Sequence, residues 1–472
     1  MERSTIAAIS TPPGTGGIGI IKISGPSALS IGKKIFHKKG PFRRALDDKP
    51  AKYDNPEISF QPHRFYYGHI IDPDTDQLID EVLILFMKAP ASYTREDVIE
   101  IHSHAGHAVL QAILNLVLNS GSKIAQPGEF TRRAFLNGRI DLTQAEAVMD
   151  IINAKSKGAL GIAAAQIKGE LKQSIIATKK ELLKIQALCE AFIDFPDDMD
   201  EDFETRDIIA QLQTRVQNPL KELILNYESG HLIREGIKIA IIGKPNVGKS
   251  SLMNRLLNKE RVLVTDIPGT TRDMIEENLN IHGITVILTD TAGLHQTNDP
   301  VEVMGIKKTD EYIKNADLII FMKDASESVD ENDNRIYKKI KHKKHIIVRN
   351  KIDIATTDDS KNSQQKVRNE INVSVLKNSG ITELKRMIFQ AASENAQFET
   401  AHKIVPNLRQ KKLIEDACRY VKAAILSMKK DEFLDLILFE IKDAVESLNQ
   451  VLGISIRENI QNKIFEQFCI GK

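Results

Sequence analysis

The stretch that decides the fold is GKPNVGKS at residues 243–250, between the apolar run IKIAII at 237–242 and the run SLMNRLLN at 251–258. It fits the pattern G-x-x-x-x-G-K-[ST], with a strand expected before it and a helix after it, as a phosphate-binding loop requires. Gly243 and Gly248 let backbone N–H groups wrap around a phosphate, and the start of the helix adds partial positive charge. We therefore predict that Lys249 reaches the β- and γ-phosphates of a nucleotide and that Ser250 binds Mg²⁺.

Three more segments follow in the order that a GTP-binding domain requires. DTAG at 290–293 ends the strand TVILT, so Asp290 can hold Mg²⁺ through water and the Gly293 N–H can reach the γ-phosphate. NKID at 350–353 ends the strand HIIVR, and NVSVLK at 372–377 is expected to pack around the base. Asp353 can accept hydrogen bonds from guanine N1–H and N2–H₂, a donor pair that adenine lacks. Together these segments predict a GTP hydrolase.

The catalytic residues of this hydrolase are less complete. Small signalling GTPases place a water-positioning Gln after D-x-x-G, but here Leu294 follows Gly293. Asp299 and Glu302 are the acidic candidates downstream, and Arg272 is the nearest arginine in sequence to the phosphates. A metal ion near the phosphates can supply the missing positive charge.

Composition limits the class of protein. A chain of 472 residues predicts two to four domains. A net charge of +1 does not by itself indicate a nucleic-acid partner. Because no run approaches 18 apolar residues and the N-terminus lacks the features of a signal peptide, we expect no membrane span and a cytoplasmic location. Cys189, Cys418 and Cys469 are too few for a disulfide framework and are expected to be reduced thiols.

The residue pattern that predicts strands or helices changes along the chain. Residues 1 to about 120 read as strands with one helix, which ends near Gly121. A helical stretch follows, then alternating strands and helices from about 235 to 395, then a second helical stretch. The simplest arrangement is one discontinuous helical domain with an α/β unit inserted into it, because insertions are tolerated where termini lie close together. The predicted boundaries are 1–121, 122–234, 235–396 and 397–472.

The whole chain resembles the MnmE (TrmE) family of tRNA-modification GTPases. The resemblance rests on TPPGTGGIGIIKISG at 11–25, PGEFTRRAFLNGRIDLTQAEAVMD at 127–150, GKPNVGKSSLMN, TDIPGTTRD at 265–273, DTAG, NKID and the ending FCIGK. It implies a multidomain α+β protein with an N-terminal α+β domain for tetrahydrofolate binding and dimerisation, a discontinuous all-α helical domain and an inserted α/β P-loop (Ras-like) G domain. It also implies a K⁺-stimulated GTPase that works with the flavoprotein GidA (MnmG) in a heterotetramer, adding a carboxymethylaminomethyl-type group to C5 of the wobble uridine, position 34, of certain tRNAs.

The resemblance also implies site residues. Contacts to GTP or GDP fall on Asn246, Val247, Gly248, Lys249, Ser250, Ser251, Thr265, Asp266, Ile267, Pro268, Gly269, Thr270, Thr271, Asp290, Thr291, Ala292, Gly293, Asn350, Lys351, Asp353, Ser374, Val375 and Leu376. Mg²⁺ would be bound by Ser250 and Thr271, and K⁺ by Asn246, Thr265, Ile267 and Thr270. Glu302 would orient water and, with Lys249, serve catalysis. The tetrahydrofolate derivative would be bound by Lys22, Glu81, Lys123 and Lys472, although the family usually has Arg where Lys22 stands.

The tail FCIGK at 468–472 predicts a second chemical site. We expect Phe468 and Ile470 to anchor it and Gly471 to permit a turn. Cys469 is either a nucleophile or one-carbon carrier in the modification step or a buried thiol that shapes the pocket.

Other patterns are interpreted as structural, and one alternative function stays open. The G-x-G-x-x-G formed by Gly14, Gly16 and Gly19 precedes a strand, so it predicts a hairpin turn and not a dinucleotide site. His102, His104 and His107 lack acidic or Cys partners at ligand spacing. The acidic run PDDMDED at 196–202 is expected to be a solvated loop or a partner-facing patch. The alternative function is an Era-like regulatory GTPase in ribosome assembly, which would need an RNA-binding domain at the C-terminus.

Overall fold

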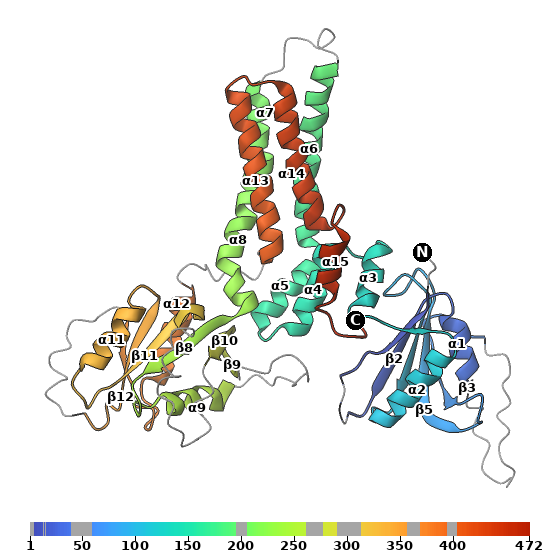
Figure 1. Cartoon of the computed structure of the whole chain (residues 1–472), viewed down its shortest axis with the longest axis horizontal. Coiled ribbons are helices and arrows are strands. Elements are labelled where there is room, and N and C mark those ends of the chain that lie inside the picture. Colours follow the sequence, from blue (N-terminus) through green and yellow to red (C-terminus); the bar gives the residue numbers. More distant parts are fainter. Residues whose placement is uncertain are drawn as a thin grey trace. The chain divides into compact units, whose positions relative to one another are not determined.

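The computed structural model describes residues 4–12, 14, 16–38, 59–194, 205–260, 277–289, 313–355, 369–393 and 404–472. These residues divide into two compact units, Met1–Met149 with Leu452–Lys472 and Asp150–Val451, and each is described here by itself. In the part of the chain so described, no helix combines the length and apolar character needed to cross a bilayer. The elements are labelled in Figure 1.

The first unit is built on a seven-stranded sheet with the order β3-β4-β5-β6-β2-β1-β7. Its strands are β1 (Ile6–Ile9), β2 (Gly19–Ser24), β3 (Phe36–Lys38), β4 (Phe65–Ile71), β5 (Leu78–Met87), β6 (Val98–Ser103) and β7 (Lys123–Ile124). β1 and β2 pair antiparallel, with Ile9 opposite Ile21, so the glycine-rich segment between them connects a hairpin as predicted. This pairing excludes the helix that a dinucleotide site would require.

Two helices, α1 (Ala28–Ile35) and α2 (His107–Asn119), share a buried core with the sheet. Inward-facing residues such as Ile21, Ile84 and Ile101 are fully buried because alternate residues of a strand point to the same face. Gly121 follows α2 with φ +107°, the left-handed region that glycine occupies at low cost, so the helix ends where it was predicted to end.

The first unit also contains helices from two distant parts of the chain. α3 (Glu129–Leu136), the first residues of α4 (Leu142–Asn153) and α15 (Glu458–Phe465) share a cluster that includes Leu142, Phe465 and Phe468. The compact unit therefore extends to Met149, whereas the predicted boundary was 121/122. Helical spacing predicts that the residues from about 122 to 230 are helical, but it does not show which core covers the apolar face of their first helices.

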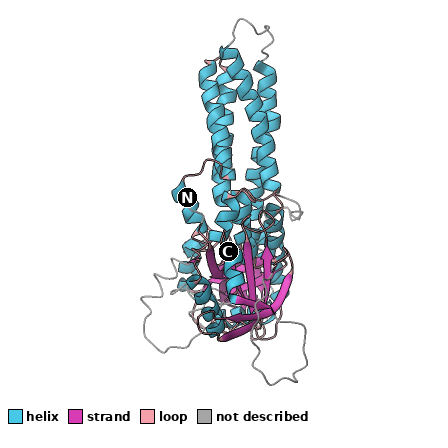
Figure 2. Cartoon of the chain, turned by 90° about the vertical axis from the view of Figure 1, so that its right-hand side faces the viewer, coloured by secondary structure: helices cyan, strands magenta, loops and turns pink. Residues whose placement is uncertain are grey.

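The second unit contains a bundle of long helices. They are α5 (Lys157–Ile167), α6 (Glu170–Asp194), α7 (Thr205–Gln211), a π-helical segment (Leu212–Gln217), α8 (Asn218–Glu235), α13 (Leu408–Lys429) and α14 (Leu434–Leu452). α13 packs along α8, although about 170 residues separate them, and the bundle contains no strand among its described residues (Figures 1 and 2). Gln166 Nε2 also donates a 2.7 Å hydrogen bond to the carbonyl oxygen of Val405, which joins the two helical stretches of the sequence.

A six-stranded sheet with the order β13-β12-β11-β8-β10-β9 completes the second unit. Its strands are β8 (Ile237–Gly243), β9 (Glu277–Ile281), β10 (Ile284–Thr289), β11 (Leu318–Asp324), β12 (His345–Asn350) and β13 (Glu370–Asn372), and only β9 is antiparallel to its neighbour. Helices α9 (Lys249–Glu260) and α12 (Ile381–Ser393) pack on one face, while α11 (Glu331–Ile340) packs on the other. The carboxyl ends of β8, β11 and β12 meet at one edge, where ligands bind in such sheets.

Candidate nucleotide-binding site

The loop 243–250 connects the end of β8 to the start of α9. Asn246 and Gly248 have φ values of +62° and +99°, so the loop turns through two left-handed residues. A Cβ at position 248 would lie 2.4 Å from Asn350 Nδ2, and one at Gly243 would lie 2.4 Å from the carbonyl oxygen of Met322. Both glycines are therefore required by the space around the loop, and Gly248 also by its backbone angle.

Asn350 holds three segments of the site together. Its Nδ2 donates to the carbonyl oxygen of Val247 over 2.9 Å, and its Oδ1 accepts from Val375 N over 3.1 Å. The side chain is buried, so water cannot replace either bond. The phosphate-binding loop, the NKID segment and the 374–376 segment are thus held in fixed relation by one amide group.

Asp353 is the predicted acceptor for guanine. Ser374 Oγ donates a 2.6 Å hydrogen bond to Asp353 Oδ1 and accepts one from Lys377 N over 3.1 Å. The bond from Ser374 holds the pKa of the Asp353 carboxyl below its ordinary value. At neutral pH the group is therefore an anionic acceptor with a fixed orientation.

These segments surround a cavity of ≈ 520 Å³. The cavity is lined by Asn246, Gly248, Ser251, Asn254, Arg255, Asn350, Lys351, Asp353, Ile354, Val375 and Leu376. Sequence reasoning did not predict Asn254, Arg255 and Ile354. The spacing of 251, 254 and 255 on α9 is i, i+3 and i+4, so a helical projection from Ser251 could have found the first two.

Lys249 and Ser250 lie in the first turn of α9. Lys249 Nζ donates to the carbonyl oxygens of Gly243 at 2.9 Å and Lys244 at 2.7 Å, so its ammonium lies within the phosphate-binding loop. Ser250 is exposed at the N-terminus of α9, where backbone N–H groups favour anions.

Lys244 connects the same loop to α11. Its Nζ lies 3.0 Å from carboxylate oxygens of both Asp330 and Asp333, and these contacts raise the pKa of Lys244. Asp330 also accepts from Asp333 N as the N-cap of α11. The loop is therefore held from α11 as well as from Asn350.

Several predicted residues lie outside the described residues. They are Thr265, Asp266, Ile267, Pro268, Gly269, Thr270, Thr271, Arg272, Asp290, Thr291, Ala292, Gly293, Leu294, Asp299, Glu302 and the run 196–202.

A second group of predicted residues gathers in the first unit. Lys22 Nζ lies 3.6 Å from Glu100 Oε1, and 5.8 Å and 5.6 Å from the ring centroids of Tyr93 and Phe130. Burial, together with the nearby charge of Lys472, lowers the pKa of Lys22, and Glu100 acts in the opposite direction. The structure thus brings Lys22 and Lys472 into one electrostatic environment beside two aromatic rings.

The tail lies along β1 and the start of α3. Ser10 Oγ donates to the carbonyl oxygen of Gly471 over 3.2 Å, and Phe130 N donates to the carbonyl oxygen of Lys472 over 3.1 Å. Gly471 has φ +92°, which confirms the predicted turn. Phe468 is buried as predicted, but the prediction for Ile470 was wrong because 54% of it is exposed. Cys469 is exposed, contrary to the alternative of a buried thiol.

Two other predicted ligands lie elsewhere on the sheet, and the three histidines lie on β6, just after it and at the start of α2. Glu81 is on β5, where its contacts include Tyr67 Oη and His69 Nε2, and Lys123 is on β7 beside β1. In the sheet order, each of these strands is separated from β2, which carries Lys22, by one strand. His104 Nδ1 lies 2.7 Å from Asp80, and His102 Nε2 lies 3.5 Å from Glu100, while His107 starts α2.

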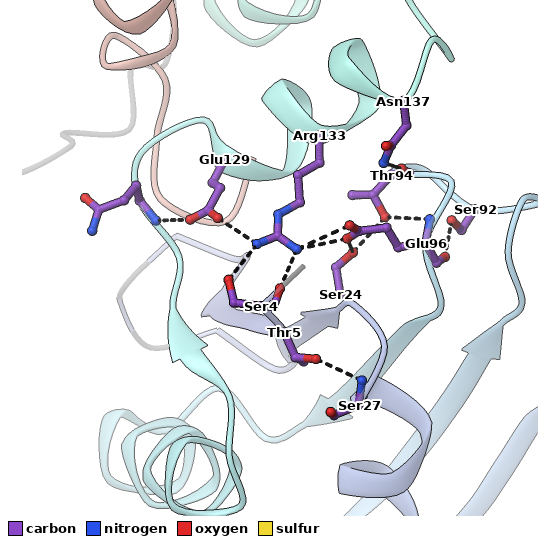
Figure 3. A network of polar contacts seen from close by, with 11 residues as sticks. Ser4, Thr5, Ser24, Ser27, Ser92, Thr94, Glu96, Glu129, Arg133 and Asn137 are labelled. Atoms are coloured by element: carbon purple, nitrogen blue, oxygen red, sulfur yellow. Dashed lines mark hydrogen bonds and ion pairs between the residues drawn. The ribbon is translucent and has the colours of Figure 1, made fainter. Parts of the chain in front are cut away.

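A polar network fixes α3 against the sheet (Figure 3). Arg133 donates to Glu96 Oε2 at 3.0 Å, to Glu129 Oε1 at 2.8 Å and to the carbonyl oxygen of Ser4 at 2.8 Å. Glu96 Oε2 also accepts from Ser24 Oγ on β2 over 2.8 Å. The string PGEFTRRAFLNG thus supplies the residues that hold α3, and with it Phe130, beside Lys22 and the tail.

The strand, glycine-rich loop, helix and base-side acceptors of the second unit define a P-loop GTP hydrolase. Family models match both parts of the chain, as "GTP-binding protein TrmE N-terminus" over residues 5–139 and "MnmE helical domain" over residues 142–469. The chain belongs to the MnmE family of tRNA modification GTPases.

Relatives of the same name match over the whole chain. The tRNA modification GTPase MnmE of Acetivibrio thermocellus is 41% identical, covering 100% of both chains. That of Bacillus subtilis is 38% identical, covering 99% of this chain and 100% of the relative. Among solved structures, Aquifex aeolicus Era bound to GDP.AlF4⁻ is 29% identical over 39% of this chain and 66% of its own, with a TM-score of 0.26. The G domain of T. maritima FeoB is 27% identical over 33% and 98%, also with a TM-score of 0.26.

Proposed function

We propose that GTP binds with its guanine in the ≈ 520 Å³ cavity and its phosphates on the 243–250 loop. The observation that carries this proposal is the Asn350 amide, which joins both loops while Asp353 presents an anionic acceptor on the base side. Lys249 would leave its loop carbonyls for the β- and γ-phosphates, which offer a stronger charged partner. Guanine would be selected through the two hydrogen bonds that it donates to Asp353.

The metal ions proposed for hydrolysis bind at the same loop. Mg²⁺ would be held by Ser250 and Thr271, and the exposed hydroxyl of Ser250 at the start of α9 fits a hard cation beside phosphate. K⁺ would be held by Asn246, Thr265, Ile267 and Thr270. Asn246 fits this role because it is exposed within the loop and can offer an amide oxygen. Glu302 would position the attacking water, and the cation supplies positive charge for the developing phosphate oxygens.

The proposed purpose of hydrolysis is modification of tRNA in the cytoplasm. Membership of the MnmE family supports a homodimer that works with a flavin-dependent partner, GidA (MnmG), in a heterotetramer. The product would carry a carboxymethylaminomethyl-type group on C5 of the wobble uridine, with a tetrahydrofolate derivative as carbon donor. Hydrolysis and modification would use separate groups of residues, one in each compact unit.

The residues around Lys22 suit a tetrahydrofolate derivative. The rings of Tyr93 and Phe130 offer faces for a flat heterocycle, and the ammonium groups of Lys22 and Lys472 offer partners for the carboxylates of its glutamate tail. Glu81 and Lys123 stay candidates through the family resemblance. Cys469 is exposed next to Lys472, so its thiolate could add to uridine C6 and leave again after C5 has reacted.

Deleting the gene and analysing tRNA nucleosides by mass spectrometry tests the function. We expect loss of the wobble modification and unchanged ribosomal subunit profiles. Unchanged wobble uridines together with altered ribosomal subunit profiles would instead support the Era-like alternative. Expressing Cys469→Ser in the deleted strain tests the thiol, because full modification by that variant would exclude the nucleophile role.

The potassium site has its own test. We expect hydrolysis to be much faster in K⁺ than in Na⁺ at equal ionic strength, and Asn246→Ala to remove that difference. Equal rates in the two salts, or a rate in K⁺ that Asn246→Ala does not change, would exclude the Asn246 assignment.

A further inference from the structure

Asp324 is a buried carboxylate at the carboxyl end of β11, beside the proposed guanine pocket but absent from its lining. Its Oδ2 lies 2.6 Å from Lys351 Nζ, and the Asp324 side chain is only 5% exposed. Its Oδ1 accepts from Ser326 N at 2.9 Å and Ser326 Oγ at 2.6 Å. Both carboxylate oxygens are therefore used, one to fix the carboxylate and one to bind Lys351.

Burial and hydrogen bonding act in opposite directions on this carboxyl group. Burial raises the pKa of Asp324, but the hydrogen bonds from Lys351 and Ser326 outweigh it and hold the pKa below its ordinary value. The carboxylate is thus charged at neutral pH, and Lys351 is the cation that compensates it.

Lys351 enters the site with an unusual backbone. It has φ +65°, a left-handed angle that a residue with a side chain rarely adopts. Lys351 lines the cavity together with Asn350 and Asp353. With the backbone fixed by the turn and the ammonium fixed by Asp324, the four-carbon stem has two fixed ends.

We propose that Asp324 is a positioning residue for the nucleotide, because it anchors the Lys351 ammonium so that the hydrocarbon stem of that lysine packs against one face of the guanine base. This inference rests on the proposed guanine pocket. A hydrocarbon stem packs on any flat base, so Asp324 increases affinity, while Asp353 keeps the choice of base. Without the anchor, each binding event would have to restrict a long and flexible side chain.

A double-mutant cycle on the full-length chain tests the proposal with fluorescent GDP as the probe. We expect Asp324→Asn and Lys351→Ala, which removes the stem, each to raise the Kd for GDP about tenfold. We expect the double variant to bind no more weakly than Lys351→Ala alone, because Asp324 acts only through that lysine. The kcat at saturating GTP should stay within about twofold in Asp324→Asn, since the base is remote from the γ-phosphate.

Two further variants keep the test decisive. Ser326→Ala loosens the carboxylate without removing it, so a smaller loss of about two- to threefold is expected, and it should vanish in the Lys351→Ala background. Glu370→Gln removes a different carboxylate, which lies 3.7 Å from Arg349 on β12, and should leave GDP binding unchanged.

The outcomes separate the inference from the function on which it rests. If Lys351→Ala binds GDP normally, the proposed pocket itself is wrong. If Lys351→Ala weakens binding while Asp324→Asn and Ser326→Ala do not, or if their effects add to that of Lys351→Ala, the pocket stands and the positioning role of Asp324 is overturned.

Discussion

Asn350 Nδ2 donates a 2.9 Å hydrogen bond to the carbonyl oxygen of Val247, and this bond joins the base side of the cavity to the phosphate side. The same amide accepts from Val375 N, so one side chain spans the loops that would contact both ends of GTP. A nucleotide bound across these loops would contact both of them, so nucleotide binding should also stabilise the loops against unfolding.

The first prediction concerns this bridge. Asn350→Ala leaves the carbonyl of Val247 and the N–H of Val375 buried without partners, which should lower the free energy of unfolding by about 2 kcal/mol. Chemical denaturation should show this loss in the GTP-binding domain, and the Kd for GDP should increase. Asn372→Ala, at an exposed position of β13, is the matched control and should change neither quantity. A bridge variant as stable as the control would show that water replaces the amide.

The second prediction concerns the pH dependence of guanine binding. The bond from Ser374 lowers the pKa of Asp353, so the acceptor stays ionised as pH falls through the ordinary carboxyl range. A lowered pKa keeps the Asp353 carboxyl ionised at the ordinary Asp pKa, and the group becomes protonated only at a lower pH. In Ser374→Ala the pKa of Asp353 should rise toward its ordinary value, and GDP affinity should therefore begin to fall at a higher pH than in the unmodified chain.

Titration of the Kd for GDP between about pH 6 and about pH 3 measures this shift, since the ordinary Asp pKa is about 3.9 and the pKa of Asp353 lies below it. Circular dichroism at each pH shows that the chain is still folded. Ser379→Ala, in the same loop, is the control, because only the backbone of Ser379 bonds to Ser374. If the Kd for GDP rises over the same acidic pH range in Ser374→Ala and in the unmodified chain, the role given to the Ser374 hydroxyl is contradicted.

The nucleotide site was predictable from sequence to the extent that its parts are local. Residues 243–250 specify a turn by their glycines, and the strands at 237–243 and 345–350 are rich in Ile and Val and end in functional residues. These patterns depend on neighbours in the chain, so motif and element can be recognised together. Ile354 and Asp324 were missed because their relevance depends on which loops the sheet brings together, whereas Asn254 and Arg255 could have been found from Ser251 by helical spacing.

In the first unit, sequence patterns predicted the helices but not the partners they pack against. Helical periodicity predicted helices from about residue 122 onward but could not show that the first of them pack with Phe465 and Phe468 from the far end of the chain. Ile470 was predicted as an anchor from its apolar side chain alone, but the tail buries Phe468 and Gly471 and leaves Cys469 and Ile470 between them exposed. Such assignments need the tertiary partner, which residue type does not reveal.

The third prediction concerns the network that holds α3. Arg133→Met leaves the Glu96 carboxylate, whose side chain is 9% exposed, without its cation, and should destabilise the first unit by about 3 kcal/mol. Adding Glu96→Gln should recover much of this loss because no buried charge then remains. Arg95→Met, an exposed arginine whose Nη1 donates to the carbonyl oxygen of Asn137, is the control and should cost less than about 1 kcal/mol.

Thermal unfolding followed together with GTP hydrolysis measures this effect. Since Arg133 lies in the first unit and the nucleotide cavity in the second, the Kd for GDP should be unchanged in folded Arg133→Met. A double variant that is less stable than Arg133→Met would show that Glu96 contributes through its other bonds, such as that from Ser24, more than through the ion pair.

The last prediction separates the two chemical sites. Gly471 has φ +92°, and a Cβ there would lie 2.5 Å from the carbonyl oxygen of Ile9, so Gly471→Ala must move the tail away from β1. The strained backbone alone costs about 1–3 kcal/mol, enough to displace a short segment held by a few hydrogen bonds. Tetrahydrofolate binding, measured by calorimetry, should weaken at least about tenfold, because Lys472 moves with the tail. Gly17→Ala, where a Cβ meets nothing within 4 Å, is the matched control. The kcat for GTP should be the same in both variants, and a parallel loss of GTP hydrolysis in Gly471→Ala alone would contradict the independence of the two sites.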